Sequence, residues 1–496
     1  MTTNVKTPTG MSEAQKGIGM IVCLATIVLA VLDQNIVSAA AVPIVRELDP
    51  VHGMERMPWL ISAFALASTA ALPLYGKLCD VLGAKRVFIG AVGVFLAGSA
   101  LCGIAQDMGQ LIAFRALQGI GGGGLMSVTM VVIARIKEGE AGGSGRGGSM
   151  GGIFAGVGMS VGPFIGGLFA DAGNWRWIFY INIPLGVLII AAAALVLRFP
   201  RHSSAHKVDF LGAGLAAAFA SGLLLITEWG GDEYAWSSPV VLGLIAATLA
   251  MLGLFIWRQA VAAEPILPLK LFTIRVVRLG FAVQGLVGLA MMGSIVYVMT
   301  YLMVARGVAS SSAGTFMIPM AIGLTAVGLL SGRLAAKGWS TRTFLVSGSL
   351  FNTVALLLLG MSGTGTSLWA IRGEMLLIGI GFGQLIGILI MAVQDAAPRE
   401  HLGVATTGVR FFQTLGGSLG AAIFGSVMVR LYSAEVPGTS INGIARLAGD
   451  ARDHAVASFV SAVDAVFFTA AAVCLLTALI ALRFPTPKPA EPVLAA

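Results

Sequence analysis

Two ionisable residues, Asp33 and Arg115, stand inside long apolar runs of this sequence. At 1.5 Å per residue, Asp33 lies roughly 15 Å from the end of its run and Arg115 roughly 8 Å from the same side. An extended arginine side chain would reach the acid if the two segments are neighbours. Arg115 would favour the charged carboxylate and burial would favour the neutral acid, and a proton carrier needs both forms. A static buried ion pair that holds two helices in register is the alternative.

Two other acids are weaker candidates for carrying a proton. Glu228 and Glu374 lie near the ends of apolar runs, where Glu228 is equally suited to an interfacial position and Glu374 would approach a central cavity. No clustered nucleophile, metal-ligand set or phosphate-binding loop accompanies them, so we expect neither an enzyme nor an ATP-driven pump. The sequence predicts no cofactor and no metal, with a proton gradient as the energy source.

The composition places these residues in a membrane protein. Hydrophobic residues make up 57% of the 496 residues, charged residues only 11%, and the mean hydropathy is +0.90. Soluble domains carry roughly 25% charged residues, so a polytopic helical membrane protein is the expected class. The net charge of +8 is scattered over short loops without an aromatic-rich basic stripe. We therefore expect contact with membrane lipid and no nucleic-acid partner.

Runs of about 20 apolar residues predict an all-α fold with fourteen spans. The predicted spans cover residues 17–43, 58–76, 87–105, 110–134, 149–171, 176–197, 210–229, 239–257, 279–303, 310–332, 343–361, 370–393, 403–429 and 457–482.

Basic residues predict the orientation of these spans. With the N-terminus inside, eight of the 31 Lys and Arg residues face outside, two lie within spans and the remaining 21 face inside. This asymmetry favours an even number of crossings with both termini cytoplasmic.

The spans divide into two halves of six with an inserted pair between them. We predict tails at 1–16 and 484–496, an N-terminal bundle at 17–198, the inserted pair and its linkers at 199–275, and a C-terminal bundle at 276–483. Weak internal symmetry supports the pairing, because YGKLCDVLGAKR after the second span corresponds to SGRLAAKGWSTR after the tenth. Repeated halves are typical of transporters that rock around a central site.

A glycine face in the fifth predicted span carries further information. The string GVGMSVGPFIGG, residues 156–167, repeats glycine every four residues beside a proline that would bend the helix. Such a face lets a neighbouring backbone approach closely, and a plain packing seam is the alternative to a functional bend. The residues concerned are Gly158, Gly162, Pro163, Gly166 and Gly167.

Five strings together resemble the fourteen-span drug:proton antiporter branch of the major facilitator superfamily. They are LDQNIVSAAAVP (32–43), GKLCDVLGAKR (76–86), LIAFRALQGIGGG (111–123), GVGMSVGPFIGG (156–167) and WRWIFYINIPLG (175–186). The resemblance covers nearly the whole chain and implies a major facilitator fold. It also implies proton-coupled export, with the fifth-helix motif bearing on the direction of transport.

The loop string predicts a conformational latch. Gly76 and Gly83 would permit a tight turn, and Asp80 beside helix ends would bond free N–H groups together with Lys85 or Arg86. Val81 stands where the family commonly has arginine, and the second-half copy GRLAAKG lacks an acid, so a latch would reside in the first half. A solvated turn with ordinary inside-facing charges is the alternative.

We expect an exporter of small amphipathic compounds such as drugs, working by alternating access as a monomer in a bacterial plasma membrane. A facilitator or importer of a small metabolite, or an exporter of non-drug compounds, is the alternative. Polar, aromatic and methionine side chains would line an adaptable cavity, although ordinary helix packing explains each as well. The cavity candidates are Gln118, Phe154, Met159, Phe281, Gln284, Met292 and Tyr297.

Overall fold

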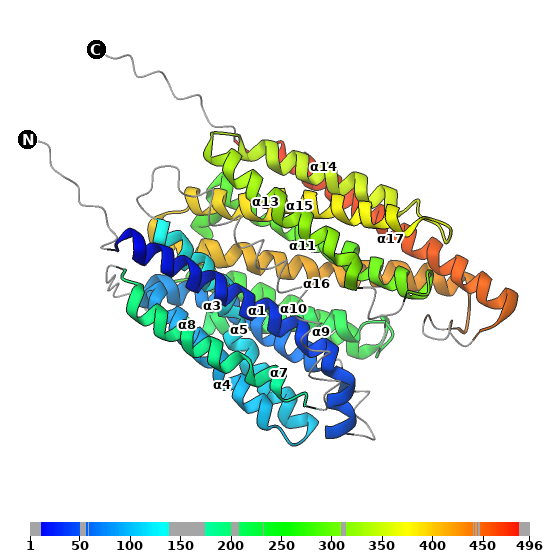
Figure 1. Ribbon diagram of the computed structural model, residues 1–496, viewed down its shortest axis with the longest axis horizontal. Helices are drawn as coiled ribbons and strands as arrows, with labels where there is room; N and C mark the ends of the chain where they lie inside the picture. Colours follow the sequence, from blue (N-terminus) through cyan, green and yellow to red (C-terminus); the bar gives the residue numbers. More distant parts are fainter. Residues whose placement is uncertain are drawn as a thin grey trace, which may run out of the picture.

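A computed structural model describes most of the chain as a bundle of long helices. The described residues are 11–49, 56–57, 59–137, 174–199, 208–231, 233–308, 314–439, 441, 444 and 447–485. Within these ranges one isolated bridge, between Gly230 and Tyr234, is the only β-type pairing. The first residues of α1 and the last of α17 lie at the same end of the bundle, called the terminus end below (Figure 1).

Thirteen helices of the described residues are long and apolar enough to cross a membrane, and they correspond to thirteen of the fourteen predicted spans. The predicted fifth span, 149–171, lies outside the described residues. The all-α fold class is confirmed. The helices of the first half are α1 (Glu13–Leu48), α3 (Trp59–Leu82), α4 (Ala84–Ile104), α5 (Met108–Lys137), α7 (Trp177–Tyr180) and α8 (Asn182–Val196).

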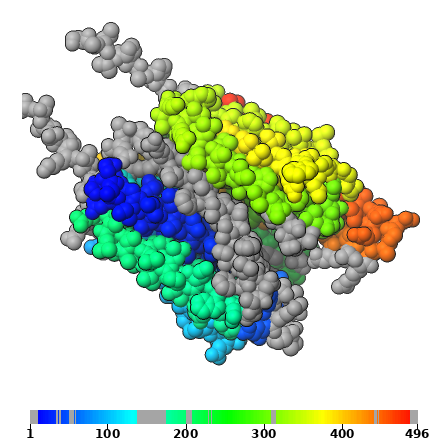
Figure 2. All heavy atoms as spheres, in the orientation of Figure 1, coloured from blue at the N-terminus to red at the C-terminus, as the bar shows by residue number. Residues whose placement is uncertain are grey.

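The second half repeats the pattern of long antiparallel helices. It comprises α11 (Arg275–Val304), η2 (Gly314–Phe316), α13 (Met317–Ala336), α14 (Thr341–Leu359), α15 (Leu368–Ala396), η3 (Arg399–His401), α16 (Leu402–Glu435) and α17 (Gly449–Ala481). In Figure 2 the blue-to-teal first half and the yellow-green-to-orange second half occupy separate parts of the visible face. Each half buries its own apolar core.

The inserted helices α9 (Phe210–Trp229) and α10 (Pro239–Val261) form a hairpin beside the junction of the halves. Arg258 donates to both carboxylate oxygens of Asp209, at 3.0–3.1 Å, which fixes α10 to the start of α9. Helix α9 packs against α3 of the first half and against α16 of the second. The short helix η1 (Leu269–Thr273) then leads into α11.

Glycine lets α11 and α16 approach closely in the second half. A Cβ atom on Gly416 would collide with the backbone of Gly285, and one on Gly288 would collide with the backbone of Gln413. Small residues at such a crossing favour tight packing of membrane helices. The seam fixes α16, which also carries the main contact between the two halves.

Candidate functional site

Asp33 lies at the centre of a buried polar network in the first half. Its side chain has no exposed surface, and its Oδ2 accepts a bond from Nη1 of Arg115 at 2.9 Å. Its Oδ1 accepts from the side-chain amides of Gln118 and Asn182, both at 2.8 Å. The two amides also donate to Oγ of Ser99, which donates in turn to the Phe179 carbonyl. Three donors therefore stabilise the charged carboxylate away from water.

Four helices bring these side chains together. Arg115 and Gln118 are three residues apart on α5, so both face α1, which supplies Asp33. Gly98, beside Ser99 on α4, has no side chain, and the Gln118 backbone lies where a Cβ atom would be. Asn182 is the first residue of α8 and reaches the network from the fourth helix.

Arg115 has partners besides Asp33. Its Nε donates to the Leu60 carbonyl at 3.1 Å, and its Nη1 donates to Oε1 of Gln118 at 2.6 Å. The guanidinium also lies 4.3 Å from the ring centroid of Phe64, within the range of a cation–π contact. The cation is therefore hydrogen-bonded whether or not Asp33 carries a charge.

The sequence indicated the pair but not the whole network. The depth estimate for Asp33 and Arg115 brought the two side chains within reach, and the structure places them in contact. Gln118, one of the cavity candidates, is hydrogen-bonded within this network, as the alternative of ordinary helix packing expects. Ser99 and Asn182 were missed, although Asn182 stands in the quoted string WRWIFYINIPLG as a lone amide in an apolar run.

Among the described residues, Asp80 makes the closest polar contact between the halves. Its carboxylate accepts the backbone N–H of Gly403 at 2.8 Å and of Val404 at 3.0 Å, in the first turn of α16. The first N–H groups of a helix have no intrahelical acceptor and carry the positive end of the helix dipole, so a carboxylate there is stabilising. The contact lies at the terminus end, because α3 ends there and α16 begins there.

The structure corrects the predicted partners of this carboxylate. The predicted bonds from free helix N–H groups are present and come from α16. The predicted cations differ, because Lys85 donates to the Ala194 carbonyl at 2.7 Å and Arg86 is exposed. Gly83, with φ of +87°, is the whole link between α3 and α4, as the tight turn requires. Gly76 belongs to the helix interior instead. A Cβ atom on it would collide with Thr407 and the α16 backbone, so its role is close approach of the two halves.

Two further bonds join the halves at the terminus end. Arg135 at the end of α5 donates to the Arg399 carbonyl at 3.3 Å. Gln394 near the end of α15 donates to the Met130 carbonyl at 3.5 Å. Together with the Asp80 contact, these bonds join the two halves at the terminus end.

A second cluster fastens the opposite end of the first half. Glu47, near the end of α1, accepts a bond from Nε1 of Trp175 at 2.7 Å and forms an ion pair with Arg176. Arg176 also donates to the Ala105 carbonyl at 3.0 Å. The hydrogen bond from Arg176 lowers the pKa of the Glu47 carboxyl below its ordinary value of 4.5, against the smaller effect of burial. This cluster ties α1 to α4 and to the start of α7.

Those remaining predicted site residues that the structure describes do not gather at one cavity. Phe281 stacks on Phe412 at 4.9 Å in an apolar core, and Tyr297 packs edge-on against Phe424. Gln284 is fully buried, and its amide has no hydrogen-bond partner among the residues that the structure describes. Met292 is 37% exposed. Glu374 is buried in the second turn of α15, on the side of the bundle opposite the terminus end. Several predictions fall on parts that the structure does not describe, namely the Glu228 side chain, Phe154, Met159, Gly158, Gly162, Pro163, Gly166 and Gly167.

Comparison with known proteins decides the family. A profile of the Major Facilitator Superfamily matches residues 22–421. The chain belongs to the Major Facilitator Superfamily. It is 36% identical over 397 residues to the multidrug transporter protein MdtP of Bacillus subtilis (strain 168), covering 80% of this chain and 72% of that protein. It is 31% identical over 441 residues to multidrug resistance protein 3 of the same organism, covering 86% and 84%.

Among solved structures, the human organic anion transporter MFSD10 (TETRAN) superposes with a TM-score of 0.64 at 15% identity, covering 94% of this chain and 99% of that one. At this identity the likeness shows the shared fold alone. The protein is therefore a multi-span membrane transporter of the superfamily and not an enzyme. The resemblance carried by the five sequence strings is confirmed at the level of the family.

Proposed function

We propose that this protein exports small amphipathic compounds in exchange for protons, with Asp33 as the acid that carries the proton. The observation that carries the proposal is the buried network of Asp33, Arg115, Gln118, Asn182 and Ser99. Intramembrane ionisable groups are costly, and in membrane proteins they typically mark ion or proton pathways. The printed names of the relatives, a multidrug transporter and a multidrug resistance protein, support drug-like substrates.

The network is suited to a reversible proton step. When a proton binds one oxygen of Asp33, the acid loses its charge and its ion pair with Arg115. The guanidinium then keeps its hydrogen bonds to the Leu60 carbonyl and the Gln118 amide oxygen, and its cation–π contact with the Phe64 ring. Gln118 and Asn182 keep Ser99 as a shared acceptor. Neither protonation state leaves the buried cation without a hydrogen-bond acceptor, so both are accessible at this site.

Alternating access would follow from the contacts at the terminus end, which we propose is cytoplasmic. Breaking the Asp80 bonds to α16 and the Arg135 and Gln394 bonds would let the halves separate there. Substrate would enter from the cytoplasm after this separation, and proton uptake by Asp33 from outside would favour its release outward. At a membrane potential, each inward charge contributes about 2.3 kcal/mol per 100 mV to this export.

Gln284 is a proposed polar contact for the substrate. Its amide is fully buried in α11 and has no hydrogen-bond partner among the described residues. An unpaired buried amide costs about 1–3 kcal/mol, which a polar substrate group would recover.

Transport in proteoliposomes with an imposed pH gradient tests the proposal. Asp33→Asn should abolish proton-driven accumulation of a compound panel while sparing downhill exchange. The matched control is Asp453→Asn, which alters an exposed acid at the start of α17. If Asp33→Asn still accumulates substrate with an unchanged proton requirement, Asp33 does not carry the proton. Accumulation without proton countertransport in the unmodified protein would instead indicate a facilitator or another coupling ion.

A further inference from the structure

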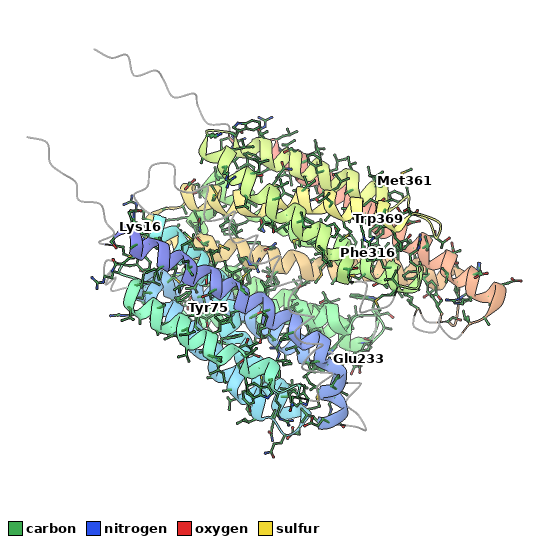
Figure 3. All side chains as sticks on the ribbon, viewed as in Figure 1. Lys16, Tyr75, Glu233, Phe316, Met361 and Trp369 are labelled. Atoms are coloured by element: carbon green, nitrogen blue, oxygen red, sulfur yellow. The ribbon has the colours of Figure 1, made fainter. Side chains whose placement is uncertain are left out.

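Arg410 lies in the second half, on the face of α16 that meets the first half. A Cβ atom on Gly403, in the first turn of α16, would collide with the Gly76 carbonyl of α3. Arg410 follows Gly403 by seven residues, or two helical turns, so it lies on the same face roughly 10 Å further along the helix. Helix α16 runs from the terminus end, marked by Lys16 in Figure 3, towards the end marked there by Met361. Arg410 therefore lies between the halves, beyond their contacts at the terminus end.

The Arg410 guanidinium has no acidic partner in the part of the chain that the structure describes. The side chain is partly buried, and its Nη1 donates to Oε1 of Gln413 at 2.8 Å. Gln413 is one turn deeper on α16, so this bond keeps the guanidinium inside the bundle. Arg115 of the first half, in contrast, is paired with Asp33. A cation inside a membrane helix bundle is costly without a counter-charge, and such groups typically mark a substrate or ion pathway.

Gln413 connects Arg410 to the neighbouring helix α11. Its side chain is buried, and its Nε2 donates to Sδ of Met291 on α11 at 3.5 Å. A Cβ atom on Gly288 would collide with the Gln413 backbone, so α11 and α16 touch at this level. The arginine, the glutamine and the methionine therefore follow one another in contact along one side of the α11–α16 crossing.

The Gln284 amide lies on the same side of this crossing. Gln284 is two turns before Met291 on α11, so the two residues share a face of that helix. Gly285, the next residue, lies against the Phe412 carbonyl, which places Gln284 at about the depth of Arg410. The amide is fully buried, and neither its nitrogen nor its oxygen has a hydrogen-bond partner among the described residues. A cation without a counter-charge and an amide without a partner therefore occur together.

We propose that Arg410 and Gln284 bind the carboxylate of an amphipathic organic acid, so that anionic compounds are among the substrates of this transporter. The planar fork of a guanidinium matches the two oxygens of a carboxylate. The Gln284 amide nitrogen would donate a further bond to the same group. Gln413 is a positioning residue, because its bond to Arg410 holds the guanidinium in place.

The surroundings of this site suit a ligand with an apolar body. Met291 contacts Gln413, and Met292, which is 37% exposed, lies beside Gly417 of α16. Methionine side chains are flexible and polarizable, so they adapt to apolar groups of different shape. A bound anion would also supply the counter-charge that Arg410 lacks among the described residues. The inference rests on the proposed function, because it names a substrate class for the proposed exporter.

Equilibrium dialysis of radiolabelled naphthoate against the full-length protein in lipid nanodiscs measures this binding without transport. The neutral naphthamide has the same rings and nearly the same size, so the comparison isolates the negative charge. The unmodified protein should bind naphthoate roughly tenfold to a hundredfold more tightly than naphthamide, the ratio expected for hydrogen bonds that involve a charged group. Empty nanodiscs measure the partitioning of each compound into lipid.

Variants assign the preference to the two side chains. Arg410→Gln should lower the affinity for naphthoate to that for naphthamide and leave the affinity for naphthamide unchanged. Arg410→Lys should lose part of the preference, because an ammonium group does not bind both carboxylate oxygens in a fork. Gln284→Leu should weaken naphthoate binding several-fold through the loss of one donor to a charged group. The matched control Arg430→Gln makes the same change at an exposed arginine of α16 and should have no effect.

The proposal is overturned if the unmodified protein binds naphthoate no more tightly than naphthamide, a comparison that needs no variant. It is also overturned if Arg410→Gln keeps its helical circular dichroism and the full preference for naphthoate, since Arg410 would then bind no substrate anion. Tighter binding of a trimethylnaphthylammonium cation than of naphthoate would overturn it as well.

The dialysis result is separate from the test of the proposed function. Proton-driven export of other compounds without a preference for naphthoate would refute this inference alone. Naphthoate binding that depends on Arg410, in a protein that moves no protons, would support the site and contradict the proposed exchange.

Discussion

Charge neutralisation at Asp33 should cost the folded protein several kcal/mol. Asp33→Asn keeps the size of the side chain and an acceptor for Gln118 and Asn182, but removes the counter-charge of Arg115. Removing one partner of a buried ion pair costs about 3–5 kcal/mol. Arg115 keeps its hydrogen bond to the Leu60 carbonyl and its contact with the Phe64 ring. We therefore expect the free energy of unfolding to fall by about 3 kcal/mol, the lower end of that range.

A double-mutant cycle separates the pair from its surroundings. Arg115→Met leaves Asp33 as a buried carboxylate with two amide donors, so it should cost about 3–5 kcal/mol by the same reasoning. The double variant carries no buried charge here and should cost less than the two single changes together. The coupling energy should fall near the upper part of the range of about 0.5–3 kcal/mol seen for residues in contact.

Equilibrium unfolding of the purified protein in mixed micelles, followed by tryptophan fluorescence, measures these free energies. Asp453→Asn, an exposed acid, serves as the control and should change stability by less than about 0.5 kcal/mol. Single-variant costs that add fully in the double variant would refute the energetic coupling of Asp33 and Arg115. The network would then be a set of independent contacts and not a charge-coupled site.

Three other perturbations test the ends of the bundle. Asp80→Asn keeps one acceptor for the two N–H groups of α16 and loses the negative charge at this helix start. Transport should therefore fall, while substrate binding stays measurable by equilibrium dialysis. Normal transport would mean that the loop is only a turn. Glu47→Gln should cost less than about 1 kcal/mol at pH 7, since the pair is half-exposed. Because folding lowers the Glu47 pKa, this stabilisation is complete above the ordinary value of 4.5 and is lost as pH falls through the lower folded value, so thermal unfolding of variant and parent should converge in acid. Cysteines introduced at the exposed positions Lys337 and Glu435 should be labelled from the cytoplasmic and the outer side respectively. Background labelling should be small because the four native cysteines are buried. Labelling of both positions from one side would contradict the topology.

The spans could be predicted from the sequence because the thickness of the bilayer fixes the length of an apolar helix. The prediction for 210–229 matches α9 to the residue. Predicted ends differ where helices continue into polar sequence, as at the start of α17, because hydrogen bonding within a helix does not require an apolar environment. The separation of α7 from α8 at Ile181 has no hydropathy signal.

The candidate site could be predicted only in part. The depth of Asp33 and Arg115 along their helices follows from counting residues, so their pairing could be predicted from the sequence. The direction in which a small polar side chain faces does not follow from hydropathy, so Ser99 and Asn182 were missed. The partner of Asp80 lies 323 residues away, in the other half, and no local pattern in the loop specifies it.

The inserted helices contact both halves of the transporter. Helix α9 contacts α3 and α16 at once, and Ala220 of α9 shares a buried cluster with Leu72 and Phe411 of the two halves. Lys77 of α3 is also bonded to Glu264, which follows α10, at 2.8 Å. If the halves rotate as proposed, this hairpin must slide along at least one of them, because α9 packs against both. Under that proposal, we expect the rate of conformational switching to depend on the contacts that α9 makes with α3 and α16.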